Sequence, residues 1–159
     1  MIFELTDEQR LVQETAREFA HNDIAPTLVE EEQNHEFRLD RVARMGELGF
    51  FSCGVPEELG GTGFGFMESV LMAEQIAKVS ASWRLPFNMQ NLGPALTVAK
   101  FGTEAQQHKF IPGWVAGTQI GFFGMTEPES GSDVASMKTV ARDRGDHWEL
   151  RGNKIWVSN

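Results

Sequence analysis

The sequence contains one cysteine, few positive charges and no long apolar run. Because Cys53 stands alone among 159 residues, no intrachain disulfide can form, and no group of cysteines and histidines has the spacing of a zinc site. The net charge of -9, without a run of Lys and Arg, argues against nucleic acid as a partner. No stretch could span a bilayer, and the first residues do not resemble a signal peptide. We therefore expect a cytoplasmic protein without a metal or membrane insertion, although a processed organelle protein would have the same composition.

The first two thirds of the chain carry helix signals. Thr6 to Gln9 has the pattern of a capping box, and apolar residues follow at helical spacing until Pro26 interrupts them. Further helices are expected over about 39–48 with Gly49 as the cap, over 66–77, over 84–100 with a bend or helix start at Pro94, and from a second capping box at 103–106 toward residue 114. The glycine-rich stretch VPEELGGTGFGF lacks the spacing of a phosphate cradle and is predicted to be loop. The acidic run 30–32 is predicted to be a solvated helix end.

After Gly117 the pattern becomes that of strands. Strand-like segments cover 119–125, 137–142, 148–150 and 154–158, and turn residues at 143–146 and 151–153 join the later ones as hairpins. The predicted fold class is therefore α+β. It consists of an all-α helical bundle in residues 1–116, followed by the beginning of an antiparallel β-domain in residues 117–159.

The stretch FFGMTEPESGSD, residues 122–133, contains residue types that suit ligand binding. Small residues let a ligand approach the backbone, and the N–H groups and hydroxyls of Ser130, Gly131 and Ser132 could bind a phosphate or a planar heterocycle. The same residue types also form ordinary turns, so a plain turn is the alternative. Taken alone, Trp156 would be most simply a buried core aromatic.

Two motifs together resemble a known family. FGMTEPESGSDVASMKT, followed by GDHWELRGNKIWVSN, resembles the acyl-CoA dehydrogenase pattern T-E-P-x-x-G-S-D and K-x-W-[IV]-[ST]-N, and VPEELGG stands in the expected place before them. The resemblance covers essentially the whole chain. It implies an oxidoreductase that acts on CH-CH groups and uses FAD to dehydrogenate an acyl-CoA thioester, taking hydride from the β-carbon and giving the α-proton to a glutamate base.

The resemblance also implies roles for particular residues. The cofactor would be bound by Phe123, Gly124, Met125, Thr126, Gly131, Ser132, Trp156, Val157 and Ser158. Thr126 would hydrogen-bond the isoalloxazine, Trp156 would pack on it, and the Ser158 hydroxyl would approach its N5. Ser132 would lie against both the cofactor phosphate and the acyl-CoA. Arg84 resembles the arginine with which glutaryl-CoA dehydrogenases hold the distal carboxylate of their substrate, and a surface or helix-packing arginine is the alternative.

The chain departs from the family in length. Family members are more than twice as long, and their catalytic glutamate and C-terminal helical domain would lie beyond Asn159, so no catalytic residue is assigned here. Glu127 is interpreted as part of the binding motif and not as the base. We expect a fragment that is inactive alone, from a homotetramer that passes electrons to electron-transferring flavoprotein. The alternatives are a non-catalytic binding or assembly module, an acyl-CoA oxidase or a nitroalkane-type relative.

Overall fold

The computed structural model describes residues 4–158, which form two compact units, 4–121 and 122–158. Regular structure in the first unit is helical, and the second contains a two-stranded antiparallel sheet, so the predicted α+β class is confirmed. The helices are α1 (Asp7–Phe19), α2 (Leu28–Asn34), α3 (Leu39–Glu47), α4 (Phe66–Val79), α5 (Ala81–Leu92), α6 (Pro94–Phe101) and α7 (Glu104–Val115). Within residues 4–158, no helix is long and apolar enough to cross a membrane.

Local signals fix where several helices begin and end. The Thr6 hydroxyl accepts a hydrogen bond from the Gln9 amide, and the Gln9 side chain accepts one from the Thr6 amide, so the predicted capping box is confirmed. The same arrangement opens α7 at Thr103. A π-helical turn (Ala20–Ile24) follows α1 directly. The predicted helix over 84–100 is two helices, because Pro94 occupies the first turn of α6, where no backbone N–H is needed.

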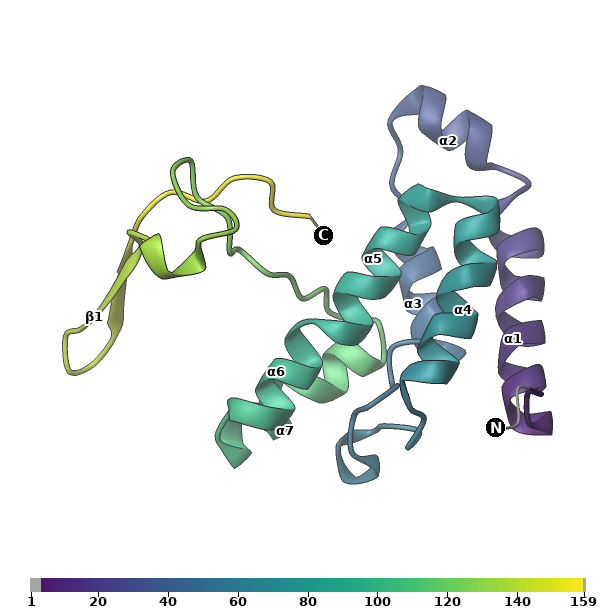
Figure 1. Cartoon of the computed structure of the whole chain (residues 1–159), viewed down its shortest axis with the longest axis horizontal. Coiled ribbons are helices and arrows are strands. Elements are labelled where there is room, and N and C mark those ends of the chain that lie inside the picture. Colours follow the sequence, from purple (N-terminus) through teal and green to yellow (C-terminus); the bar gives the residue numbers. More distant parts are fainter. Residues whose placement is uncertain (1–3, 159) are drawn as a thin grey trace. The chain divides into compact units, whose positions relative to one another are not determined.

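Apolar side chains build two clusters in the first unit. Helices α1, α4 and α5 lie side by side (Figure 1). Between them and α3 lies the larger cluster, where Phe19 and Phe50 meet edge to face with ring centroids 5.3 Å apart. The smaller cluster joins α6 and α7 to the loop before α4, through Ala95, Ile111 and Val55. Burial of the apolar side chains in these two clusters provides the main force that holds the helices together.

The acidic run in α2 is not simply a solvated helix end, so that prediction was wrong for Glu31. Glu31 is buried, and its carboxylate accepts hydrogen bonds from Arg41 Nη1 at 2.6 Å and Nη2 at 2.7 Å. The Arg41 guanidinium also lies 4.5 Å from the centre of the Trp83 ring. The partner lies ten residues away on α3, so the local charge pattern could not reveal it.

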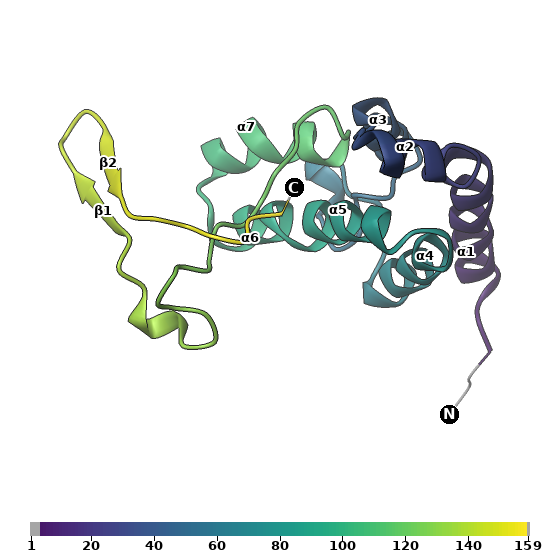
Figure 2. The ribbon, with the colours of Figure 1, turned by 90° about the horizontal axis from the view of Figure 1, so that it is seen from above.

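The second unit contains one hairpin and irregular backbone. Strands β1 (Val140–Asp143) and β2 (Trp148–Arg151) pair antiparallel with Val140 opposite Arg151 (Figure 2). A short 3-10 turn (Val134–Ser136) precedes them. The strands predicted at 119–125 and 154–158 are absent from the described residues, so these predictions were wrong. A strand requires a paired neighbour, and the Ile155 amide instead donates to the carbonyl of Thr126, one residue beyond the segment 119–125.

Candidate functional site

The loop after Phe122 is shaped by a tight turn. The Glu127 amide donates to the Ser130 carbonyl at 2.8 Å, and the Ser130 amide donates back to the Glu127 carbonyl at 3.2 Å. The Ser130 hydroxyl donates to the Asp133 carbonyl at 2.8 Å. Both polar groups of Ser130 are therefore engaged within the loop, and the expectation that they are free for a ligand was wrong for this residue.

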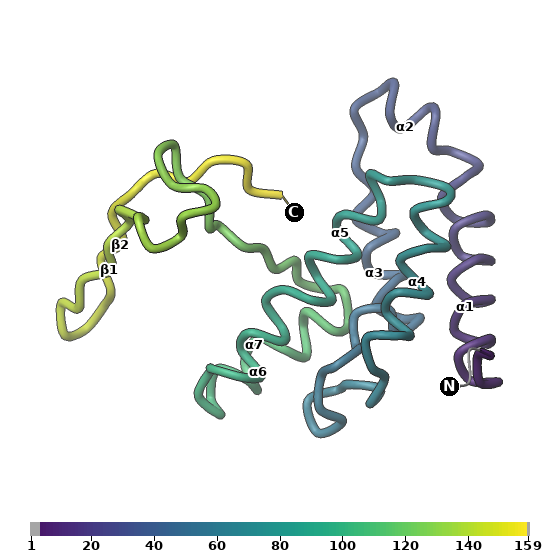
Figure 3. The backbone as a smooth tube through the Cα atoms, in the orientation of Figure 1, coloured from purple at the N-terminus to yellow at the C-terminus, as the bar shows by residue number. Residues whose placement is uncertain are grey.

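The structure brings the loop and the carboxyl-terminal segment of the second unit together. The Ile155 amide donates to the Thr126 carbonyl at 3.0 Å, and Lys154 Nζ donates to the Met125 carbonyl at 3.1 Å. A methyl group on Gly124 would lie 3.9 Å from a Val157 methyl. Figure 3 traces the green tube of the loop beside the yellow tube of the final residues. Residues 123–126 and 154–158 thus share one surface.

Hydrogen-bond donors in the loop and in the carboxyl-terminal segment are available to a ligand. Within residues 4–158, no partner is found for the hydroxyls of Thr126, Ser132 and Ser158 or for the backbone N–H groups of Gly131 and Ser132. Nothing lies within 4 Å of the position where a side chain on Gly131 would begin. Donors without protein partners, next to an uncrowded glycine, suit a ligand with phosphate or carbonyl acceptors.

Apolar side chains accompany these donors. Phe123, Met125 and Val157 are all exposed, and Trp156 is 85% exposed. The alternative of a buried core tryptophan is therefore wrong. Trp156 also has a φ of 57°, in the left-handed region, which costs a non-glycine residue about 1 kcal/mol or more. An exposed indole beside free donors provides a surface for a flat heterocycle.

Glu127 is the most constrained carboxylate of the second unit. It is buried, and it accepts the amides of Lys138 at 2.7 Å and Thr139 at 2.9 Å, together with Lys154 Nζ at 2.9 Å. The adjacent Thr139 hydroxyl, the Lys138 amide and the Lys154 ammonium lower the pKa of Glu127 to about 2. A carboxylate of such low basicity, with its oxygens engaged by three hydrogen bonds, is unsuited to abstract a proton. Sequence reasoning assigned no role to Lys154, although its place two residues before Trp156 was an available signal.

Arg84 belongs to the first unit. It lies in the first turn of α5, and the helix predicted to begin at about residue 84 begins three residues earlier, at Ala81. The Ser80 hydroxyl caps this helix by accepting from the Trp83 amide at 3.1 Å. Arg84 is half-buried, and within the described residues its guanidinium has no carboxylate partner. Its neighbour Trp83 stacks on Phe37 with ring centroids 4.9 Å apart. An unpaired guanidinium on a helix anchored in this way can bind an anion.

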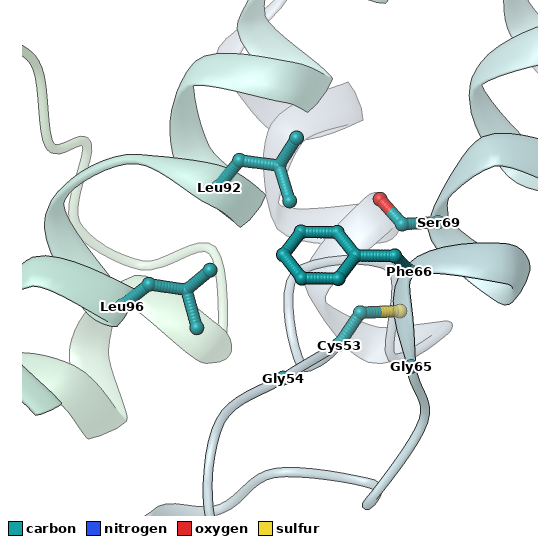
Figure 4. A pocket seen from close by; sticks show the side chains of 7 residues that line it. All are labelled: Cys53, Gly54, Gly65, Phe66, Ser69, Leu92 and Leu96. Atoms are coloured by element: carbon teal, nitrogen blue, oxygen red, sulfur yellow. The ribbon is translucent and has the colours of Figure 1, made fainter. Parts of the chain in front are cut away.

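A small cavity of about 130 Å³ lies between α4, α5 and α6 (Figure 4). Phe66, Leu92 and Leu96 point into it, and Cys53 forms part of its wall. Burial, with the charge of Glu68, raises the pKa of the Cys53 thiol to about 11. The thiol therefore remains protonated at neutral pH and is a poor nucleophile.

No group of three or more His, Cys, Asp or Glu side chains is arranged for a metal ion in the described part of the chain.

Two family models match consecutive parts of the sequence. The model described as "Acyl-CoA dehydrogenase, N-terminal domain" matches residues 6–118, and "Acyl-CoA dehydrogenase, middle domain" matches residues 122–159. The chain belongs to the acyl-CoA dehydrogenase family. The family inferred from the two motifs is therefore confirmed.

Several acyl-CoA dehydrogenases resemble the chain over nearly its whole length. It is 40% identical to the glutaryl-CoA dehydrogenase of Desulfococcus multivorans over 162 residues, which covers 100% of this chain and 42% of that protein. A glutaryl-coenzyme A dehydrogenase in complex with glutaryl-CoA matches with a TM-score of 0.95 and 40% identity, covering 100% of this chain and 41% of that one. The acyl-CoA dehydrogenase of Bacillus anthracis complexed with FAD matches with a TM-score of 0.91 and 32% identity, covering 98% and 27%. The chain therefore spans less than half the length of these acyl-CoA dehydrogenases.

Proposed function

We propose that this chain forms the helical domain and the first part of the flavin-binding domain of an FAD-dependent acyl-CoA dehydrogenase. One observation carries the proposal. The TEPESGSD loop and the KIWVS segment share a surface that combines free hydrogen-bond donors with the exposed indole of Trp156. This combination supports a ligand that is both a flat heterocycle and a phosphate ester.

The proposed cofactor residues divide by their chemistry. Thr126 and Ser158 offer hydroxyls to the polar edge of an isoalloxazine, while Gly131 and Ser132 offer amides to the diphosphate. Phe123, Gly124, Met125, Trp156 and Val157 provide the apolar walls and the close backbone approach. Bound FAD would supply a planar acceptor for the hydride that leaves the β-carbon of the thioester. The indole of Trp156 would shield one face of the isoalloxazine from water.

No residue of this chain is proposed as the base that removes the α-proton. Glu127 is excluded from that role because its lowered pKa makes the carboxylate a weak base and three hydrogen bonds engage its oxygens. The proposed base is a glutamate beyond Asn159. Electron-transferring flavoprotein as acceptor and a homotetramer are proposed from the family resemblance. A cytoplasmic location is proposed from the single cysteine, which suits a reducing compartment.

The substrate is proposed to be an acyl-CoA with a distal carboxylate, such as glutaryl-CoA, with Ser132 beside the thioester. Arg84 supports this choice, because the half-buried residue has no carboxylate partner within the described residues and its guanidinium is therefore available to an anion. The similarity to proteins named as glutaryl-CoA dehydrogenases agrees with it. The competing substrate class is an uncharged short acyl-CoA.

The test of the function uses the full-length protein that contains this chain. Purified protein should be yellow with flavin absorbance, and anaerobic addition of an acyl-CoA should bleach it. Bleaching followed by rapid oxygen consumption in air would favour an acyl-CoA oxidase. Flavin that binds but is never bleached by any acyl-CoA would favour the non-catalytic binding module. Protein that binds no FAD would contradict the proposal.

The substrate is tested by Arg84→Gln in the same protein. Loss of a charge-assisted hydrogen bond should lower kcat/KM for glutaryl-CoA by about tenfold or more, and leave the value for butyryl-CoA nearly unchanged. Arg10→Gln serves as a control, because Arg10 is an exposed surface arginine on α1. Equal losses for both thioesters, or no loss for either, would contradict a role of Arg84 in substrate choice.

A further inference from the structure

A single buried carboxylate joins three separate segments of the second unit. Glu127 belongs to the tight turn that precedes Gly131 and Ser132. Its oxygens accept the amides of Lys138 and Thr139, just before β1. The same carboxylate accepts the ammonium of Lys154, which lies after β2. One side chain therefore fixes the loop relative to both ends of the hairpin.

Lys154 completes this connection. Besides Glu127, its ammonium donates to the Met125 carbonyl at 3.1 Å. The next residue, Ile155, donates its amide to the Thr126 carbonyl at 3.0 Å. The side chain of Lys154 is only 25% exposed, so its charge is partly withdrawn from water and directed at these two oxygen acceptors. Lys154 thus sets the distance between residues 125–126 and the backbone that leads to Trp156.

Other forces are too weak to set this spacing. No apolar side chain in residues 122–158 is buried, and the buried residues there are Glu127 and Ser130. Neither 123–126 nor 154–158 belongs to a helix or a strand. With no hydrophobic core and no ladder between the segments, the hydrogen bonds of Glu127 and Lys154 position them, together with the single backbone bond from Ile155 to Thr126.

We propose that Glu127 and Lys154 are positioning residues for the flavin, which hold the loop of Thr126 at a fixed offset from Trp156 and Ser158. This inference rests on the proposed function. Neither side chain needs to touch the cofactor, since each acts through backbone groups. Exposed ion pairs contribute little to stability. The nearby Glu129–Lys138 pair, whose side chains are more than 70% exposed, therefore serves as the control.

The experiment measures FAD affinity in the full-length protein, carrying Glu127→Gln, Lys154→Gln or both. Each single variant should raise the Kd for FAD by about tenfold, because a charge-assisted hydrogen bond is lost. The visible absorption band of the bound flavin should also shift. The double variant should be little worse than the worse single variant, since the two residues act as one unit. Glu129→Gln should leave both the Kd and the band unchanged.

The outcomes separate this inference from the function on which it rests. Parent protein that fails to bind FAD would overturn both. Parent protein that binds FAD, with variants that keep its Kd and band but melt at a lower temperature, would show a purely structural pair and overturn the positioning role alone. If Glu127→Gln does not fold, Lys154→Gln decides, because it leaves the bonds between Glu127 and the backbone amides in place.

Discussion

At the scale of single residues, the most consequential group in the first unit is the Glu31–Arg41 pair. Both side chains are about 95% buried, and the guanidinium binds the carboxylate through two nitrogens while lying over Trp83. Trp83 stands next to Arg84 at the start of α5. The pair therefore anchors the helix that carries the proposed substrate arginine.

Removing one partner of this pair should be costly. In Arg41→Met, the buried Glu31 carboxylate would lose both guanidinium hydrogen bonds and keep only the more distant Arg38 cation at 3.7 Å. We therefore expect a loss of about 3–5 kcal/mol in the free energy of unfolding, measured by urea denaturation at pH 7. Arg10→Met, at an exposed pair on α1, is the control and should change the free energy of unfolding little. A loss at Arg41 no larger than at Arg10 would contradict the anchoring role.

Acid should reduce the difference in the free energy of unfolding between Arg41→Met and the parent. The hydrogen bonds from Arg41 lower the pKa of Glu31 from 4.5 to about 2 in the folded protein. The parent therefore keeps this contribution to stability above about pH 4.5, and loses it as the pH falls toward 2. In the variant, protonation relieves a buried charge that has lost its hydrogen-bonded partner, and so favours the folded state. Repeating the urea series at pH 4 should give a smaller gap between variant and parent than at pH 7.

At the scale of elements, helix α3 packs unusually close to the end of α7. A methyl group on Gly46 would lie 2.2 Å from the Ala116 carbonyl oxygen, which belongs to the backbone and cannot move aside freely. Glycine inside a helix usually costs about 1 kcal/mol relative to alanine. Gly46→Ala should nevertheless destabilise the protein, by about 1–3 kcal/mol, because the contact is overpacked. A variant that melts at or above the parent temperature would contradict the close packing.

The elements also show which signals the sequence carries. The caps at Thr6 and Thr103 and the helix start at Pro94 were predictable, because each depends on residues within one turn of helix. The absence of strands at 119–125 and 154–158 was not predictable, because an apolar pattern indicates strand propensity and not the presence of a paired neighbour. For the same reason the partners of Glu31 and Glu127, ten or more residues away, could not be read from local pattern.

At the scale of the whole molecule, the two units differ in what stabilises them. The first contains two apolar clusters, whereas no apolar side chain in residues 122–158 is buried. The second unit depends on a hairpin and on the hydrogen bonds around Glu127. Motif reading identified the candidate site residues on this unit, but composition could not show that its apolar side chains face outward. Such a surface requires a ligand or further protein to cover it.

This difference predicts how the units behave when separated. A polypeptide of residues 1–121 should fold by itself, with a helical circular dichroism spectrum and one cooperative urea transition, because both apolar clusters lie within it. A polypeptide of residues 122–159 should give the spectrum of an unfolded chain, since an isolated two-stranded hairpin is at best marginally stable in water. A cooperative transition in the shorter polypeptide, or loss of helix in the longer one, would contradict this assignment. If the assignment holds, groups outside residues 122–159 must contribute to folding the second unit, because no apolar side chain in its described residues is buried.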